Sequence, residues 1–413
     1  MSPTQTASRI PAIDWLRVLA VVAIFFGHVA YIFSVSADAS IRNPETSLAV
    51  SVYGGFVYQW AVPLLFLLAG ASSWCSLQRR ASHAYVLERV RRLLIPLLFG
   101  SVVLIPWIGY MSALNLHSFT GSYWQFFPVH FARTWAALQI PSHHHGLVAL
   151  YDTSWHLWFL GYLLLFSALP LALDRRPAGV AALVGLCDRR GGLLLLVLPM
   201  AATRMALGAA FPAYTDWSDT VVFFLCFVYG RLFMTDTRFL RAVERDRLVW
   251  LTVGCAGFAL ILATFALGYF SRWNAHPGYT PDYLVYQVLL AVNTWGWVLA
   301  FVAGGLRWLS IDNAARGYAA GAVLPFYIFH QVAVATIGTS VVEWHAGVAV
   351  KFIVISGAAF AATMVTYECV VRRSRLLRVL FGLKATEATA PSLGPQASVL
   401  AIRDGAWNPR STP

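Results

Sequence analysis

Apolar segments long enough to cross a bilayer recur throughout this chain, and no other feature limits its possible folds as strongly. A membrane-spanning helix needs about 20 mostly apolar residues. With 59% hydrophobic and 12% charged residues, the sequence carries more apolar surface than a water-soluble domain can bury. We therefore predict an all-α, polytopic integral membrane helical bundle of about ten transmembrane helices. The predicted spans are Trp15–Val35, Val50–Trp74, Leu93–Leu114, Trp155–Leu173, Gly192–Phe211, Thr220–Met234, Leu248–Phe270, Tyr283–Leu306, Tyr318–Val341 and Ala346–Cys369.

The positions of the basic residues predict how these spans are oriented. Lys and Arg are enriched in the cytoplasmic connections of membrane proteins. If the N-terminus is cytoplasmic, the outer connections hold few basic residues and both termini lie inside. The net charge of +12 is then interpreted as a topology signal and a contact with anionic membrane lipids, not as a nucleic-acid surface. The basic residues predicted outside are Arg42, Arg133, Arg204, Arg272 and Lys351.

The chain is predicted to hold one membrane domain between two terminal segments. Residues 1–12 form a cytoplasmic N-terminal segment, residues 13–380 the membrane domain, and residues 381–413 a disordered cytoplasmic tail rich in Ala, Thr, Ser and Pro. No long hydrophilic segment interrupts the spans, so any chemistry must take place inside the membrane domain. The five cysteines lie in or near spans or inner connections, which argues against a disulfide framework.

Two histidines in separate predicted spans are the strongest candidates for catalysis. Arg17 and His28 are eleven residues apart, so a helix places both on one face, about 16 Å apart along its axis. His330 lies about 21 Å along its span from Arg316. Ionisable groups near mid-membrane are costly outside a polar cavity, and imidazole suits general-base chemistry near neutral pH. A single buried histidine also fits a hydrogen bond between helices, and Gln331 fits either substrate binding or helix association.

A basic cluster precedes the third predicted span. Arg89 and Arg92 are three residues apart on one helix face, and guanidinium groups suit phosphates. Together with Arg17, they are candidates for holding the phosphates of an anionic donor. Taken alone, this cluster is more typical of a topology signal.

The segment around His156 opens the fourth predicted span at the outer interface. Trp155 and Trp158 are typical of an aromatic belt, and Trp158 is also a candidate for contacting substrate. His156 is a third catalytic candidate, placed at a shallower depth than the other two. The run His143–His145 does not indicate a metal site, because adjacent histidines diverge on a regular element and no cysteines or paired carboxylates accompany them. No metal is expected.

These motifs resemble those of the membrane acyltransferase-3 family over about residues 13–380. In that family an arginine, ten intervening residues and a histidine mark the first span, as Arg17 and His28 do here. The opening motif and the segment around His156 look most like the branch that contains glucan biosynthesis protein C, which is linked to succinylation of periplasmic glucans. The resemblance rests on Asp14–Arg17, His28, Arg89–Arg92, His156–Leu160, Asn293–Trp295, Pro325–Tyr327 and His330–Gln331.

The resemblance implies an O-acyltransferase, expected in a bacterial cytoplasmic membrane. Its donor would be an acyl-coenzyme A of acetyl or succinyl type at the cytoplasmic side. Its acceptor would be a hydroxyl of a carbohydrate or glycolipid at the outer side. By the same resemblance His28 is the catalytic candidate, and Arg17, Arg89 and Arg92 are candidates for donor binding.

One departure from the family pattern affects the expected site. Many polysaccharide O-acetyltransferases of the family carry a glutamate pair where this chain has the stretch from Trp155 to Trp158. The partner of His28 is therefore expected to be His330 or His156. The sequence leaves open whether His28 acts as a general base or carries the acyl group. A transporter or lipid-linked sugar flippase with a histidine proton relay is the main alternative, and a membrane scaffold is a third.

Overall fold

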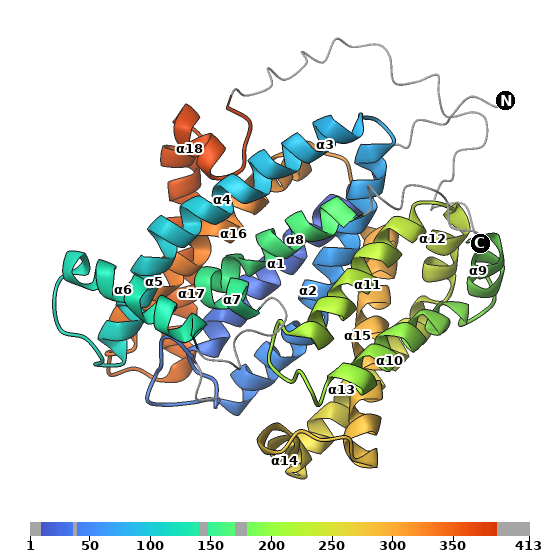
Figure 1. Cartoon of the computed structure of the whole chain (residues 1–413), viewed down its shortest axis with the longest axis horizontal. Helices are drawn as coiled ribbons and strands as arrows, with labels where there is room; N and C mark the ends of the chain where they lie inside the picture. Colours follow the sequence, from blue (N-terminus) through green and yellow to red (C-terminus); the bar gives the residue numbers. More distant parts are fainter. Residues whose placement is uncertain (1–9, 36–38, 140–147, 170–179, 386–413) are drawn as a thin grey trace.

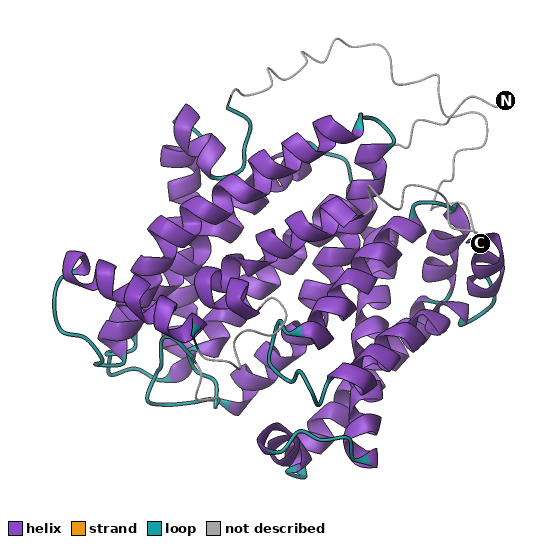
Figure 2. Ribbon diagram, in the orientation of Figure 1, coloured by secondary structure: helices purple, strands orange, loops and turns teal. Residues whose placement is uncertain are grey.

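The computed structural model describes residues 10–35, 39–139, 148–169 and 180–385 (Figure 1). Within these ranges every regular element is a helix and no strand occurs (Figure 2), so the all-α prediction is confirmed. The run His143–His145 and residues 386–413 of the predicted tail lie outside the described residues. The elements, with 3₁₀- or π-helical turns labelled η, are α1 (Pro11–Tyr31), α2 (Leu48–Leu77), α3 (Ser82–Arg89), η1 (Val90–Leu94), α4 (Ile95–Phe99), η2 (Gly100–Leu104), α5 (Ile105–Asn115), α6 (Tyr123–Leu138), α7 (Val148–Ser154), η4 (Trp155–Leu157), α8 (Trp158–Ala168), α9 (Val180–Cys187), η6 (Gly192–Leu196), α10 (Val197–Leu207), α11 (Trp217–Phe233), α12 (Thr237–Arg245), α13 (Arg247–Ala266), α14 (Tyr269–Ala275), α15 (Pro281–Trp308), α16 (Ala314–Val341), α17 (Val348–Thr366), η7 (Tyr367–Val371) and α18 (Arg375–Leu380).

Each predicted apolar span overlaps a helix, but the helices differ in length. Among the described residues, seven helices are long and apolar enough to cross a membrane. An eighth crossing is added if α11 and α12, which meet at 108°, count as one bent span. The helices at α8 and at Gly192–Leu207 are shorter. The number of crossings and the cytoplasmic placement of both termini stay predictions.

Helix α1 lies inside the bundle, where it packs against α2, α15 and α16 (Figure 1). Its buried residues Leu16, Ala20, Phe25 and Val29 follow the helical repeat, so one face of α1 is covered along its whole length. The first predicted span is therefore surrounded in large part by other helices.

Helices α2 and α11 approach each other most closely at two glycines. A Cβ atom at Gly70 would lie 1.9 Å from the carbonyl oxygen of Phe227. A Cβ atom at Gly230 would lie 1.8 Å from the carbonyl oxygen of Leu67. Small residues let membrane helices pack backbone against backbone, so these two positions fix how close α2 and α11 lie.

Gly230→Ala is expected to destabilise the protein by about 1–3 kcal/mol, because the added methyl group forces one helix backbone to move. Gly185→Ala is the matched control, since its Cβ position in α9 has no atom within 4 Å. Thermal unfolding in detergent measures both variants. Equal unfolding temperatures for the two variants would contradict the close approach of α2 and α11.

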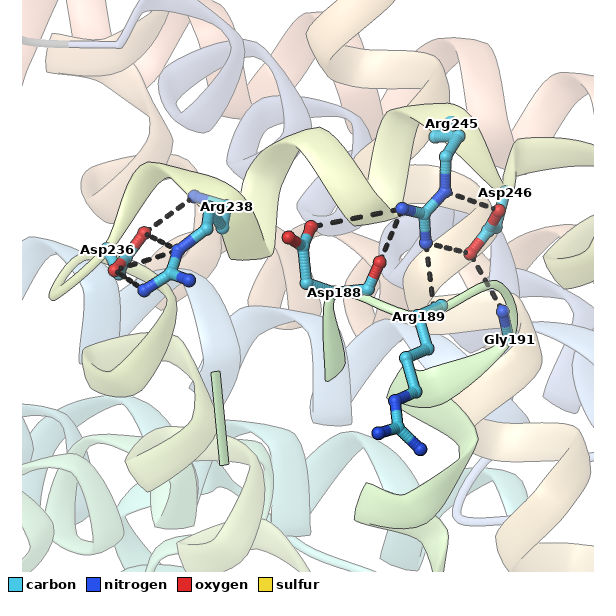
Figure 3. A network of polar contacts seen from close by, with 7 residues as sticks. All are labelled: Asp188, Arg189, Gly191, Asp236, Arg238, Arg245 and Asp246. Atoms are coloured by element: carbon cyan, nitrogen blue, oxygen red, sulfur yellow. Dashed lines mark hydrogen bonds and ion pairs between the residues drawn. The ribbon is translucent and has the colours of Figure 1, made fainter. Parts of the chain in front are cut away.

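A charged network joins the connection between α9 and η6 to the α12–α13 corner (Figure 3). Arg245 donates from Nη1 to the carbonyl oxygen of Asp188 at 2.6 Å and from Nη2 to that of Arg189 at 2.9 Å. Its Nη2 also donates to Oδ2 of Asp246 at 2.8 Å. The same Oδ2 accepts from the backbone N–H of Gly191 at 2.9 Å. The network therefore satisfies backbone groups where α9 ends.

The stability that this network contributes is expected to depend on pH. The hydrogen bond from Arg245 holds the pKa of Asp246 below its usual range. A carboxyl with a lowered folded pKa contributes stability above its unfolded pKa of about 3.9 and loses it as the pH falls through the folded value. We expect Asp246→Asn to lower the free energy of unfolding by about 1–3 kcal/mol at neutral pH, with the difference from wild type shrinking in acid. The unfolding temperatures of wild type and Asp246→Asn, measured from neutral pH into acid, test this expectation. A difference between the two proteins that does not change with pH would refute it.

Candidate active site

Three imidazoles from three different elements converge in the structure. His28 comes from α1, His156 from η4 and His330 from α16. The ring centroid of His28 lies 5.3 Å from that of His330 and 6.5 Å from that of His156. The centroids of His156 and His330 are 5.4 Å apart. All three histidines singled out in the sequence thus meet at one place, including the one expected to lie at a shallower depth.

Backbone carbonyls determine which nitrogen of His330 carries a proton. Its Nδ1 lies 2.7 Å from the carbonyl oxygen of Tyr327 and 3.2 Å from that of Phe326. Because a carbonyl oxygen only accepts, Nδ1 must donate, and Nε2 keeps a free lone pair. This Nε2 is buried and has no hydrogen-bond partner among the described residues. His330 therefore presents one basic nitrogen to the protein interior.

His156 is held in the same way, with the opposite nitrogen protonated. Its Nε2 lies 3.3 Å from the carbonyl oxygen of Ile328 and donates to it. Its Nδ1 is buried without a hydrogen-bond partner in the described part of the chain. The hydroxyl of Tyr327 donates to the backbone carbonyl of His156. Two neighbouring residues of α16 therefore fix the η4 turn, and Trp155 enters this turn in the left-handed region at φ 42°.

The three histidines differ in their access to solvent. His330 is completely buried and His156 is 8% exposed, whereas His28 is half-buried. His28 also lies only three residues before the last residue of α1, at the end that the charge pattern places outside. The depth of His28 in the membrane stays a prediction.

Arg17 lies toward the opposite end of α1 and is fixed by two partners. Its Nη2 donates to Oγ of Ser72 at 2.8 Å, and its Nη1 lies 3.5 Å from Oδ1 of Asp14. Asp14 is only 4% exposed and also accepts from Nη1 of Arg316 at 2.5 Å. A carboxylate shared by two guanidinium groups keeps Arg17 among the helices and away from lipid.

Two adjacent serines of α2 contact the surroundings of Arg17 and of Arg89. Ser73 is the neighbour of Ser72 and shares a hydrogen bond of 2.6 Å with the hydroxyl of Tyr85, which is buried. The guanidinium carbon of Arg89 lies 4.9 Å from the centroid of the same Tyr85 ring. Tyr85 and the paired serines were missed in the sequence, although two adjacent serines inside an apolar span are a signal for polar helix contacts.

Arg92 has surroundings different from those of Arg89. Its Nη1 lies 3.8 Å from Oε1 of Glu88, and its side chain is 49% exposed. The π-helical turn Val90–Leu94 begins directly after Arg89, so the two arginines do not share the spacing of a regular α-helix. The structure thus places Arg89 against Tyr85 and leaves Arg92 at the surface.

The two predicted substrate contacts follow His156 and His330 within two residues of the chain. Gln331 follows His330 in α16, and its Oε1 is buried without a hydrogen-bond partner in the described ranges. The ring of Trp158 is 5% exposed and packs against Tyr162 and Tyr214 at centroid distances of 4.9 and 5.6 Å. Contact of either residue with substrate stays a prediction.

No group of three or more His, Cys, Asp or Glu side chains in the described part of the chain is arranged to hold a metal ion. A neutral imidazole nitrogen with a free lone pair can act as a proton acceptor, and the cluster offers two such nitrogens, on His156 and His330.

One family model accounts for both the sequence motifs and this architecture. It is described as an acyltransferase domain of the acyltransferase-3 type and matches residues 10–368. This range contains all three histidines and the arginines at the other end of α1. No curated protein and no solved structure matches the chain. The match covers nearly the whole helical bundle and confirms the family resemblance, so the chain belongs to the membrane acyltransferase-3 family and is an acyltransferase.

Proposed function

We propose that the protein transfers an acetyl- or succinyl-type acyl group from acyl-coenzyme A, bound at the cytoplasmic side, to a carbohydrate or glycolipid hydroxyl at the outer side of a bacterial cytoplasmic membrane. The observation that carries this proposal is the convergence of His28, His156 and His330, with two unpartnered imidazole nitrogens turned into the protein. Arg17 lies at the other end of the same helix, as a donor site on the opposite side requires.

The donor site is proposed around Arg17 and Arg89, where guanidinium groups meet the phosphates of coenzyme A. The partly buried contacts of Arg17 with Asp14 and Ser72 hold its guanidinium group in place before the donor arrives. The axial separation from Arg17 to His28 is about 16 Å on a regular helix. The extended pantetheine arm of the donor would span this separation and bring the thioester to His28.

Transfer requires that a hydroxyl oxygen attack the thioester carbonyl carbon. A carbon–oxygen bond forms, the carbon–sulfur bond breaks, and the hydroxyl proton passes to an imidazole and then to the departing thiolate. If His28 carries the acyl group, its nitrogen attacks first and the acceptor oxygen displaces it. In both courses His156 and His330, each fixed by a backbone carbonyl, orient His28 or accept the proton.

The test supplies purified protein with acetyl- or succinyl-coenzyme A, with and without a glucose oligosaccharide. We expect release of free coenzyme A thiol and acylated sugar detected by mass spectrometry. A transporter or flippase would instead release no thiol and would move a glycan in a way that depends on the proton gradient. That combination of results would overturn the acyl-transfer proposal.

A further inference from the structure

A group of tyrosines lies near the three histidines and has no role in the chemistry described above. Tyr214, in the connection between α10 and α11, is flanked by Tyr58 of α2 and Tyr151 of α7, with ring centroids 5.0 and 5.8 Å away. The buried ring of Trp158 packs behind Tyr214 at 5.6 Å. We name Tyr58, Tyr151 and Tyr214 the tyrosine cluster.

The tyrosine cluster lies at the same level of the bundle as His28. Gly27 precedes His28 and faces α2, where a Cβ atom at Gly27 would lie 3.6 Å from Cγ1 of Val57. The next residue of α2 is Tyr58. Trp158, which contacts the cluster, begins α8 directly after the η4 turn that carries the second imidazole. Two separate segments thus connect the cluster to the candidate active site.

The tyrosine cluster is accessible and has a polar wall. Tyr58 is 53% exposed and Tyr151 is 37% exposed. Asp219 and Arg204 act electrostatically on the Tyr58 hydroxyl, pair with each other at 3.2 Å and are 13% and 15% exposed. Charged groups inside a membrane protein face polar cavities and not lipid. Tyr58 thus combines an exposed ring with a paired Arg204 and Asp219 in its surroundings.

Unsatisfied polar atoms occur along the same wall. Within the described residues, Nε of Arg204 and Oε1 of Gln287 are buried and have no hydrogen-bond partner. Gln287 is 5% exposed and lies against Gly208, whose Cβ position is 2.9 Å from the Gln287 Cδ atom. The backbone N–H of Gly208 bonds to the carbonyl oxygen of Arg204, so Arg204 and Gln287 both lie next to Gly208. A donor and an acceptor left unpaired here suit a ligand with hydroxyl groups, which both donate and accept.

We propose that the tyrosine cluster binds a neutral pyranose ring of the acceptor, with the sugar hydroxyls directed to Arg204, Asp219 and Gln287. This inference rests on the proposed function, which supplies the acceptor. Aromatic faces cover the C–H surface of a sugar ring, while tyrosine hydroxyls stay available to its polar rim. The charges of Arg204 and Asp219 cancel, so the wall favours a neutral sugar over an anionic one.

The test measures binding of a glucose oligosaccharide to the purified full-length protein by calorimetry, without any acyl donor. We expect Tyr58→Ala to weaken binding by about tenfold, and Tyr58→Phe to weaken it much less because the ring is kept. Trp124→Ala is the matched control, because Trp124 is a 78% exposed aromatic residue on α6. The proposal is overturned if the wild-type protein does not bind the sugar, if Tyr58→Ala binds it as well as wild type, or if Trp124→Ala weakens binding equally.

A second measurement separates this inference from the proposed function. One outcome is a protein that binds the sugar through Tyr58 and yet never releases thiol from the donor. That result would overturn the acyl-transfer proposal and leave the sugar site standing. Normal acyl transfer by Tyr58→Ala with an unchanged KM for the sugar would overturn the sugar site and leave acyl transfer standing.

Discussion

Replacing His28 with alanine is expected to lower the kcat/KM of acyl transfer by about 100- to 10,000-fold, the usual contribution of a general acid-base group. His28 is the half-buried member of the three imidazoles and lies within 6.5 Å of both others, measured between ring centroids. Thiol release and acylated sugar report the loss. His345→Ala is the matched control, because His345 is an exposed histidine near the start of α17.

The same assay distinguishes the roles of the three histidines. His156→Ala and His330→Ala are expected to reduce the rate less than His28→Ala, and the effects should not add when combined, because the three rings are in contact. Unfolding temperatures must stay close to wild type for this comparison. A folded His28→Ala protein that transfers acyl groups at the wild-type rate would remove His28 from the mechanism.

Arg17→Ala is expected to raise the KM for acyl-coenzyme A by about 10- to 100-fold, since it removes a guanidinium group proposed to bind phosphate. Asp14 would still be paired with Arg316, so the N-terminal ends of α1 and α16 should stay joined. Arg17→Lys is expected to recover only part of the affinity, because a lysine lacks the planar fork. Initial rates at varied donor concentration measure both variants.

The control for Arg17 is Arg375→Ala, which removes an exposed arginine from α18 and keeps the same loss of charge. Its KM for the donor should equal that of wild type. An unchanged KM in Arg17→Ala would show that the donor phosphates bind elsewhere. An equal rise in both variants would show a general charge effect and not a specific contact.

The sequence determined the class of fold because span length and hydrophobicity are local properties of the chain. The segments Trp15–Val35 and Tyr318–Val341 correspond to helices α1 and α16, since a backbone surrounded by apolar side chains must satisfy its own hydrogen bonds. The short helices around α8 and α10 were harder to assess, because their lengths alone do not decide whether they cross a membrane.

The sequence also determined that Arg17 and His28 lie on one helix, because helical rise and periodicity alone set their separation. Only the tertiary structure decided which residues surround them. His156 reaches His28 through the η4 turn held by Tyr327, and Tyr85 of α3 shares a hydrogen bond with Ser73 of α2. These contacts join different elements, and helix packing selects among many possible pairings that local hydrophobicity does not distinguish.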